Sequence, residues 1–339
     1  MLNLHKDHAN LVNISLVVFA LLSTGIAVAP ALDLQDNNAP LPSMRAMTAQ
    51  ERRGLEVYVA EGCMGCHTQQ VRNIEMDKTW GSRPSIPSDY YYSKKRMNIW
   101  QQSPSLLGSE RTGPDLTNVG MRQASEAWQM LHLFDPRMVV KGSVMPRYGW
   151  LFRVVDSAQV KMDDVVLPVP EDKLDGRGRK VVATQKAKDL VAYLLSLKQA
   201  PLPTGVVPEG FLPSPGADGK PVAATAEAGL PDGGAIFSQV CSACHQADAK
   251  GLPGAFPALA GSPIVNDGNA TKMIDIVLGG YDARPEFGPM PPQAANLTDE
   301  QIAAVINHVR SSFGNDAPPT TAEAVKSERA VIAPETAGK

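Results

Sequence analysis

One five-residue pattern occurs twice in this 339-residue chain and uses all four of its cysteines. The two copies are Cys63-Met64-Gly65-Cys66-His67 and Cys241-Ser242-Ala243-Cys244-His245. In this pattern two thiols, three positions apart, reach the two vinyl groups of one porphyrin as thioethers, and the histidine that follows is held under the iron. With no cysteine left over, the sequence predicts two covalently bound haem c groups, with His67 and His245 as proximal ligands.

Two other uses of paired cysteines fit less well. A thioredoxin-like redox pair needs a surrounding βαβ pattern, and neither copy has one. A zinc site built from two Cys-x-x-Cys pairs would separate them by about 12 to 20 residues. Here 174 residues lie between Cys66 and Cys241. The haem interpretation is therefore favoured over both.

Residues 11–32 form one apolar run that is long enough to cross a bilayer as a helix. A cleaved signal peptide is the competing interpretation, because Ala27-Val28-Ala29 resembles a small-residue cleavage site. Pro30 would hinder cleavage there, so we expect an uncleaved single-pass anchor with residues 1–10 in the cytoplasm. Covalent c-haems are attached outside the bacterial cytoplasm. The haem domains are therefore expected in the periplasm, beside the bacterial inner (cytoplasmic) membrane.

The rest of the chain predicts a mainly α fold with two cytochrome c-type domains. Residues 45–198 form the first domain, and 231–313 form the second. Between them, residues 199–230 are rich in proline and glycine and predict an extended linker. The last residues, 314–339, are rich in Ala, Pro, Thr and Glu and predict a disordered tail.

Three helices are expected in the two domains that carry the cysteine–histidine motifs. Thr48 and Glu51 form a capping box that opens a helix over 49–61, directly before Cys63. Residues 184–198 have an apolar face at helical spacing and should pack across that helix. In the second domain, a capping box at Thr298 opens a helix over 299–312.

Methionine is the expected sixth ligand of a haem that transfers electrons, because its thioether raises the reduction potential. In the second domain Met290 lies on a Gly-Pro-Met-Pro-Pro loop, whereas Met273 belongs to a helical apolar pattern and reads as core. In the first domain Met145 lies on a similar Met-Pro loop, and His132 is its one histidine rival. We therefore expect Met145 and Met290 to be the ligands.

Two prolines, Pro114 and Pro257, follow the motifs where cytochromes c place a proline against the haem. A backbone carbonyl there can accept the N–H of the proximal imidazole, a contact that orients metal ligands. Arg111 and Arg137 are candidates for pairing with haem propionates, with ordinary surface arginines as the alternative.

Charge is distributed unevenly along the chain, whose formal net charge is −3. Residues 44–199 carry a net charge of +6, and residues 231–313 a net charge of −4. This contrast is either chance variation between two surfaces or a sign that the second domain meets a basic partner, such as a basic cytochrome c. Nothing in this balance predicts binding to nucleic acid.

Several long motifs of the first domain closely resemble the mono-haem subunit II of cbb3-type cytochrome c oxidases. They are GCMGCHTQQVR (62–72), YYYSKKR (90–96), LLGSERTGPDLTNVG (106–120), HLFDPR (132–137) and GSVMPRYGWLF (142–152). The resemblance covers the anchor and residues 45–198. It implies that His67 and Met145 ligate the first haem, and that the subunit lies beside a haem–copper catalytic subunit and other oxidase subunits.

The chain departs from that family by carrying a second cytochrome c domain, which resembles the haem domains of the same oxidase's di-haem subunit. Residues 153–183 are also unfamiliar and read as an insertion. We therefore expect a non-catalytic electron-transfer subunit of a terminal oxidase. Electrons would enter at the second domain, pass to the first haem and leave for the catalytic subunit. The alternatives are the electron-entry subunit of a nitric oxide reductase and a stand-alone di-haem cytochrome or peroxidase.

Overall fold

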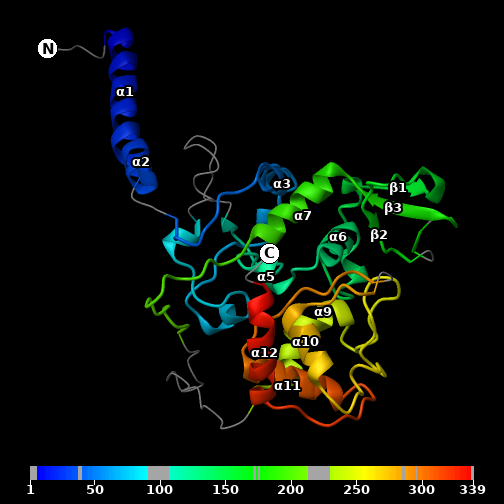
Figure 1. Ribbon diagram of the computed structural model, residues 1–339. Coiled ribbons are helices and arrows are strands. Elements are labelled where there is room, and N and C mark those ends of the chain that lie inside the picture. The colour runs from blue at the N-terminus through cyan, green and yellow to red at the C-terminus, as the bar shows by residue number, and fades with distance from the viewer. Residues whose placement is uncertain are drawn as a thin grey trace.

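A computed structural model describes residues 6–36, 40–90, 107–170, 173–174, 176–212, 230–284, 287–294 and 296–336. Most of the YYYSKKR motif and residues 213–229 of the predicted linker lie outside these ranges. The described chain is mainly helical, as expected, with an N-terminal helical rod and two domains (Figure 1).

The rod consists of α1 (His8–Ser23), a π-helical turn (Thr24–Val28) and α2 (Ala29–Asp36). It extends away from the rest of the molecule, and none of the side chains of α1 is buried (Figure 1). His8–Asp33 is long and apolar enough to cross a membrane, which agrees with the expected span over 11–32. The π turn ends two residues before Pro30, whose ring would clash with a regular preceding turn.

Two crossing helices, α3 (Ala49–Ala60) and α7 (Gln185–Ser196), organise the first domain (Figure 1). The capping box between Thr48 and Glu51 is present, as predicted. Gly54 allows the helices to approach closely, because a Cβ atom there would lie 1.9 Å from the carbonyl oxygen of Asp189. Arg53 also donates to the Asp189 carboxylate at 2.8 Å. The predicted packing of these two helices is confirmed.

Shorter elements complete the wall of the first domain. They are α5 (Val119–Arg122), α6 (Glu126–Phe134) and the 3₁₀ turns Cys63–Gly65, Glu75–Thr79, Pro87–Tyr90, Pro136–Met138, Gly149–Leu151 and Ser157–Gln159. Leu131 on α6 and Leu190 on α7 are completely buried in the core between them.

The unfamiliar segment after residue 152 forms a three-stranded antiparallel sheet. Its strands are β1 (Phe152–Asp156), β2 (Val166–Leu167) and β3 (Arg179–Ala183), in the order β1-β3-β2. Phe152 pairs with Ala183, and Val166 pairs with Val182. Val181 and Val182 are completely buried, so the central strand is part of the core of the first domain.

The second domain repeats the plan of the first with fewer residues. Its elements are α8 (Gly233–Ile236), a π turn (Phe237–Cys241), α9 (Ser242–His245), α10 (Thr271–Gly279) and α11 (Asp299–Arg310). The capping box predicted at Thr298 is present. A glycine again lies at a helix crossing, because a Cβ atom on Gly233 would lie 2.1 Å from the carbonyl oxygen of Ala304.

The prediction of a disordered tail over 314–339 is wrong for most of its length. Residues Ala322–Thr336 form α12, which packs against α10 and α11 (Figure 1). Val325 is completely buried, and Arg329 donates to the Asp299 carboxylate at 2.6 Å and to the carbonyl oxygen of Leu297 at 2.9 Å. The segment looks polar by composition, but a few well-placed contacts are enough to order its inner face.

Candidate haem sites

The first cysteine–histidine motif begins where α3 ends. Gly62 takes a left-handed conformation (φ 70°), which stops the helix, and Cys63–Gly65 follows as a 3₁₀ turn. The backbone N–H groups of Cys66 and His67 both donate to the carbonyl oxygen of Cys63, at 3.2 and 3.1 Å. The motif is therefore a compact turn held at the end of a helix.

His67 is oriented by a loop far along the chain. Its Nδ1 atom lies 2.7 Å from the carbonyl oxygen of Pro114, and the N–H of Gly113 donates to Cys66 at 2.9 Å. This contact assigns the ring proton to Nδ1, which leaves Nε2 for a metal. Burial lowers the pKa of His67, although the hydrogen bond to Pro114 acts in the opposite direction. A neutral imidazole is the form that binds iron.

The second motif has the same arrangement. The Nδ1 atom of His245 lies 2.9 Å from the carbonyl oxygen of Pro257, and burial lowers the pKa of this imidazole too. The N–H of Gly251 donates to the carbonyl oxygen of His245 at 2.8 Å. The structure therefore places both predicted prolines against the histidines that follow the cysteines, and in each case the proline's own carbonyl is the acceptor.

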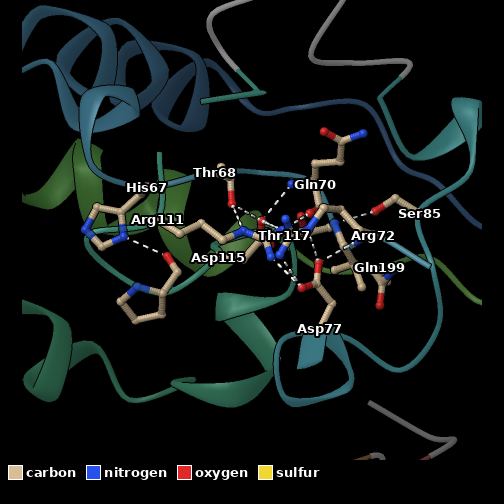
Figure 2. Close-up of polar contacts among 12 residues, drawn as sticks. His67, Thr68, Gln70, Arg72, Asp77, Ser85, Arg111, Asp115, Thr117 and Gln199 are labelled. Atoms are coloured by element: carbon tan, nitrogen blue, oxygen red, sulfur yellow. Dashed lines mark hydrogen bonds and ion pairs between the residues drawn. The ribbon is translucent and has the colours of Figure 1, made fainter. Parts of the chain in front are cut away.

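The chain between His67 and Pro114 is longer than the chain between His245 and Pro257 in the second domain. Beside it lies a buried carboxylate cluster, formed by Asp77 and Asp115 with their partners (Figure 2). Thr68 donates to Asp115 at 2.6 Å, and Arg72 donates to Asp77 through its backbone N–H, also at 2.6 Å. Arg111 joins the two carboxylates by pairing with both. Burial would raise the pKa of Asp77, but the hydrogen bonds from Arg111 and Arg72 lower it to about 2.

These contacts correct the expectation about propionate partners. The guanidinium of Arg111 donates hydrogen bonds to Thr68, to Asp77 and to the carbonyl oxygen of Gln70. The side chain of Arg137 is about half exposed and lies 3.8 Å from Asp135. Neither arginine lines a cavity beside the motifs.

Arg122, which the sequence did not single out, lines the cavities beside both motifs. It donates to the carbonyl oxygen of Asp115 at 2.6 Å and lies over the ring of Trp80, 5.1 Å from its centroid. Its Nε atom has no hydrogen-bond partner among the described residues. Burial lowers the pKa of this guanidinium to about 10. A partly buried cation of this kind suits an anionic group in the cavity.

The cavity beside the first motif has a volume of about 740 Å³ and is lined by Cys63, Cys66, His67 and Met145. His132 also lines it, and this ring stacks on Trp128 with centroids 4.6 Å apart and an interplanar angle of 10°. Burial lowers the pKa of His132 to about 4. The walls are mainly apolar side chains, as a planar tetrapyrrole requires. Both candidate sixth ligands are thus within the same cavity.

The cavity beside the second motif is smaller, with a volume of about 150 Å³. Its lining includes Cys241, Cys244, His245, Met273 and Met290. The Met290 loop is held by a two-way backbone contact, in which Tyr281 donates to Met290 at 3.0 Å and accepts from it at 2.8 Å. Met273 lies on α10 and is buried in the hydrophobic core, as the sequence predicted.

Three of the four thiols lie in surroundings that disfavour a thiolate. Burial raises the pKa of Cys63, Cys241 and Cys244 to about 12 each, so these groups are protonated at neutral pH. Within the described ranges, no three His, Cys, Asp or Glu side chains converge as a possible metal-ion site. The residues around each motif fit a covalently attached haem better than a zinc ion or a redox disulfide.

The two cavities adjoin at the interface between the domains. Ser242 and Ala243 of the second motif line the first cavity, while Arg122 and Ser125 of the first domain line the second. Phe256 of the second domain is buried in the hydrophobic core of the first. Each domain therefore contributes to the wall of the other domain's cavity.

Comparison with known proteins agrees with this organisation. The model of the family "Cytochrome C oxidase, mono-heme subunit/FixO" matches residues 3–197, and the cytochrome c model matches residues 231–313. Cytochrome c-552 of Thermus thermophilus is 37% identical over 112 residues, which cover 29% of this chain and 85% of that protein.

Two further relatives are matched over a smaller share of their length. The fructose dehydrogenase cytochrome subunit of Gluconobacter japonicus is 39% identical over 108 residues, 29% of this chain and 22% of that protein. The cbb3-type cytochrome c oxidase subunit CcoP of Rubrivivax gelatinosus is 33% identical over 99 residues, 29% of this chain and 31% of that protein. This chain belongs to the mono-haem FixO family of cytochrome c oxidase electron-transfer subunits and carries a second cytochrome c domain at its C-terminal side.

Proposed function

We propose that this protein is a membrane-anchored di-haem relay in a cbb3-type terminal oxidase. One observation carries the proposal: two cavities, each with a Cys-x-x-Cys-His motif and a methionine in its wall, adjoin across one domain interface. A haem in each cavity would supply reversible one-electron exchange. The match to the FixO family supports the oxidase as the complex in which this exchange is used.

The side chains in the cavities divide into three roles. Four cysteines form the thioether links: Cys63, Cys66, Cys241 and Cys244. His67 and Met145 would ligate one iron, and His245 and Met290 would ligate the other. The carbonyl oxygens of Pro114 and Pro257 accept the Nδ1 protons and fix the direction of each imidazole. The apolar walls would hold the porphyrin, and a methionine ligand on each iron would leave no free position for a substrate.

The anchor and the charges support one direction of transfer, from the second domain to the first. We place the haem domains in the periplasm, with residues 1–10 in the cytoplasm. The second domain, with its net charge of −4, receives electrons from a basic donor such as a soluble cytochrome c. Electrons then pass to the first haem and on to the haem–copper catalytic subunit of the complex, where oxygen is reduced.

Gentle detergent extraction from the native membrane, followed by identification of the co-purifying chains, tests this proposal. We expect a haem–copper catalytic subunit in the same complex, and oxygen consumption when a reduced cytochrome c is supplied. A chain that is released by salt and elutes alone would contradict both the anchor and the oxidase assignment. A complex that consumes nitric oxide but not oxygen would assign the chain to a nitric oxide reductase instead.

A further inference from the structure

The contact between Trp128 and Ala243 joins the two haem sites at one point of the domain interface. We propose that Trp128 is the residue through which the second haem site is electronically coupled to the first. The proposal rests on the relay function proposed above, and it adds a route and a named residue to that function. The indole of Trp128 lies between the two sites and binds neither iron.

On one side, Trp128 belongs to the first cavity. It lies on α6, where the side chain of Ser125 caps the helix by accepting from the N–H of Trp128 at 3.3 Å. Its side chain is 7% exposed, lines the cavity and stacks on His132. The indole is therefore held rigidly in the wall that faces the first haem.

On the other side, Trp128 reaches the attachment loop of the second haem. Its Nε1–H donates to the carbonyl oxygen of Ala243 at 2.9 Å. Ala243 lies between Cys241 and Cys244, and its carbonyl belongs to the peptide bond that joins it to Cys244. From this carbonyl to the Cys244 sulfur, which would carry a thioether, every step is a covalent bond.

The route through these groups has one hydrogen bond and no open gap between the Cys244 sulfur and the first cavity. Electron tunnelling decays less steeply along covalent and hydrogen bonds than across empty space, so this path is favoured over a route through solvent. In the transfer, one electron leaves the iron at His245 and arrives at the iron at His67. No proton moves, and the indole is neither oxidised nor reduced.

A structural role alone would also place a tryptophan at a domain interface, so the variants must separate packing from coupling. Trp128→Phe keeps an aromatic ring in the cavity wall but removes the pyrrole half of the indole together with its N–H donor, so controls for lost packing are needed. Trp150→Phe is the matched control, because Trp150 donates in the same way to Glu61 at 3.0 Å but is 63% exposed. Asn296→Ala removes another hydrogen bond between the domains, to the carbonyl oxygen of Met121 at 3.2 Å.

The experiment uses the full chain with both haems in detergent. A photoexcited ruthenium complex delivers one electron, and absorbance follows its redistribution between the haems. We expect Trp128→Phe to slow this redistribution several-fold while leaving the potentials of both haems unchanged. Trp150→Phe and Asn296→Ala should redistribute the electron at the unmodified rate. Equal rates for Trp128→Phe and the unmodified chain, or a slowing by Asn296→Ala of the same size, would overturn the proposal.

A second readout does not depend on electron transfer. Hydrogen exchange of ¹⁵N-labelled tryptophan side chains in the reduced protein should show a protected indole N–H that disappears in Trp128→Phe. Exchange of that N–H as fast as the one of Trp150 would remove the contact on which the route depends. Failure of the relay itself looks different, because the unmodified chain, with both haems bound, would then show no redistribution at all.

Discussion

The Nδ1 atom of His67 lies 2.7 Å from the carbonyl oxygen of Pro114, although the two residues are 47 positions apart. In the second domain His245 and Pro257 make the same contact at 2.9 Å across only 12 positions. The same orienting contact is thus built from loops of very different length. The longer loop of the first domain contains Asp77 and is tied to Asp115, directly after Pro114, through Thr68 and Arg111.

Gly113 should tolerate no side chain. A Cβ atom there would lie 2.2 Å from Cε1 of His67, so Gly113→Ala should push the imidazole away from its position. We expect the spectrum of the first haem to become high-spin while the second is unchanged, as measured by absorbance and electron paramagnetic resonance. Gly149→Ala is the control, since nothing lies within 4 Å of its added methyl group. Unchanged spectra in Gly113→Ala would contradict the orientation of His67.

Replacing either expected methionine ligand should affect one haem at a time. A thioether ligand raises the potential of a c-haem relative to a second imidazole. Met145→His should therefore lower the midpoint potential of the first haem only, and Met290→His that of the second. Optical redox titration measures both. If His132→Ala, rather than a change at Met145, shifts the first potential and removes its sixth ligand, the histidine is the ligand.

Arg122 should tune both haems because it lines both cavities. A nearby, partly buried cation disfavours the more positive ferric state, so Arg122→Gln should lower both midpoint potentials. Arg137→Gln is the control, as its side chain is about half exposed and lines neither cavity. A shift confined to one haem, or none, would show that the charge is not shared between the sites.

Asp77 should make the first domain sensitive to acid. Its side chain is fully buried, and its pKa is lowered from 3.8 to about 2, chiefly because the hydrogen bonds from Arg111 and Arg72 outweigh the effect of burial. A lowered pKa in the folded state contributes stability above the unfolded value, here about 2 kcal/mol, which is lost as the pH falls from about 4 to about 2.

Urea unfolding at a series of pH values checks this contribution. Asp77→Asn should lower the free energy of unfolding at neutral pH by roughly that amount or more, because two arginines lose a charged partner. The difference from the unmodified chain should shrink below about pH 4. Asp163→Asn, at an exposed position, should show no such pattern. A difference that is constant down to pH 2 would argue against the role assigned to Asp77.

The terminal helix α12 should stabilise the second domain. Arg329 donates to Asp299 and to two backbone carbonyls, so Arg329→Ala should destabilise the domain by about 1–3 kcal/mol. Thermal unfolding followed by circular dichroism measures this loss. Lys326→Ala, at an exposed position of the same helix, is the matched control. An unchanged unfolding temperature in Arg329→Ala would mean that α12 contributes little to stability.

The parts of the fold that depend on short-range signals could be predicted from the sequence. The capping boxes at Thr48 and Thr298 are local patterns, and both helices begin where these residues place them. The two prolines whose carbonyl oxygens contact His67 and His245 could also be predicted, because cytochromes c place a proline at the corresponding position. The sheet after residue 152 was missed because β2 has only two residues and carries no alternating pattern.

Other parts depend on contacts that no local pattern encodes. The helix α12 has a polar composition and is ordered by tertiary contacts of Val325 and Arg329, so its sequence alone resembles a disordered tail. Trp128 and Ala243 meet across 115 positions of the chain, and only the docking of the two domains brings them together. Arg122 lines both cavities for the same reason, because the docking of the two domains brings the cavities together.

On the proposed function, one chain holds two six-coordinate haems between which an electron can pass. The most direct test of this claim is a potentiometric titration of the purified full chain, followed by absorbance in the visible range. We expect two electrons to be taken up per chain in two one-electron steps, with low-spin spectra throughout. A single step with one electron per chain, or a high-spin spectrum at either step, would contradict it.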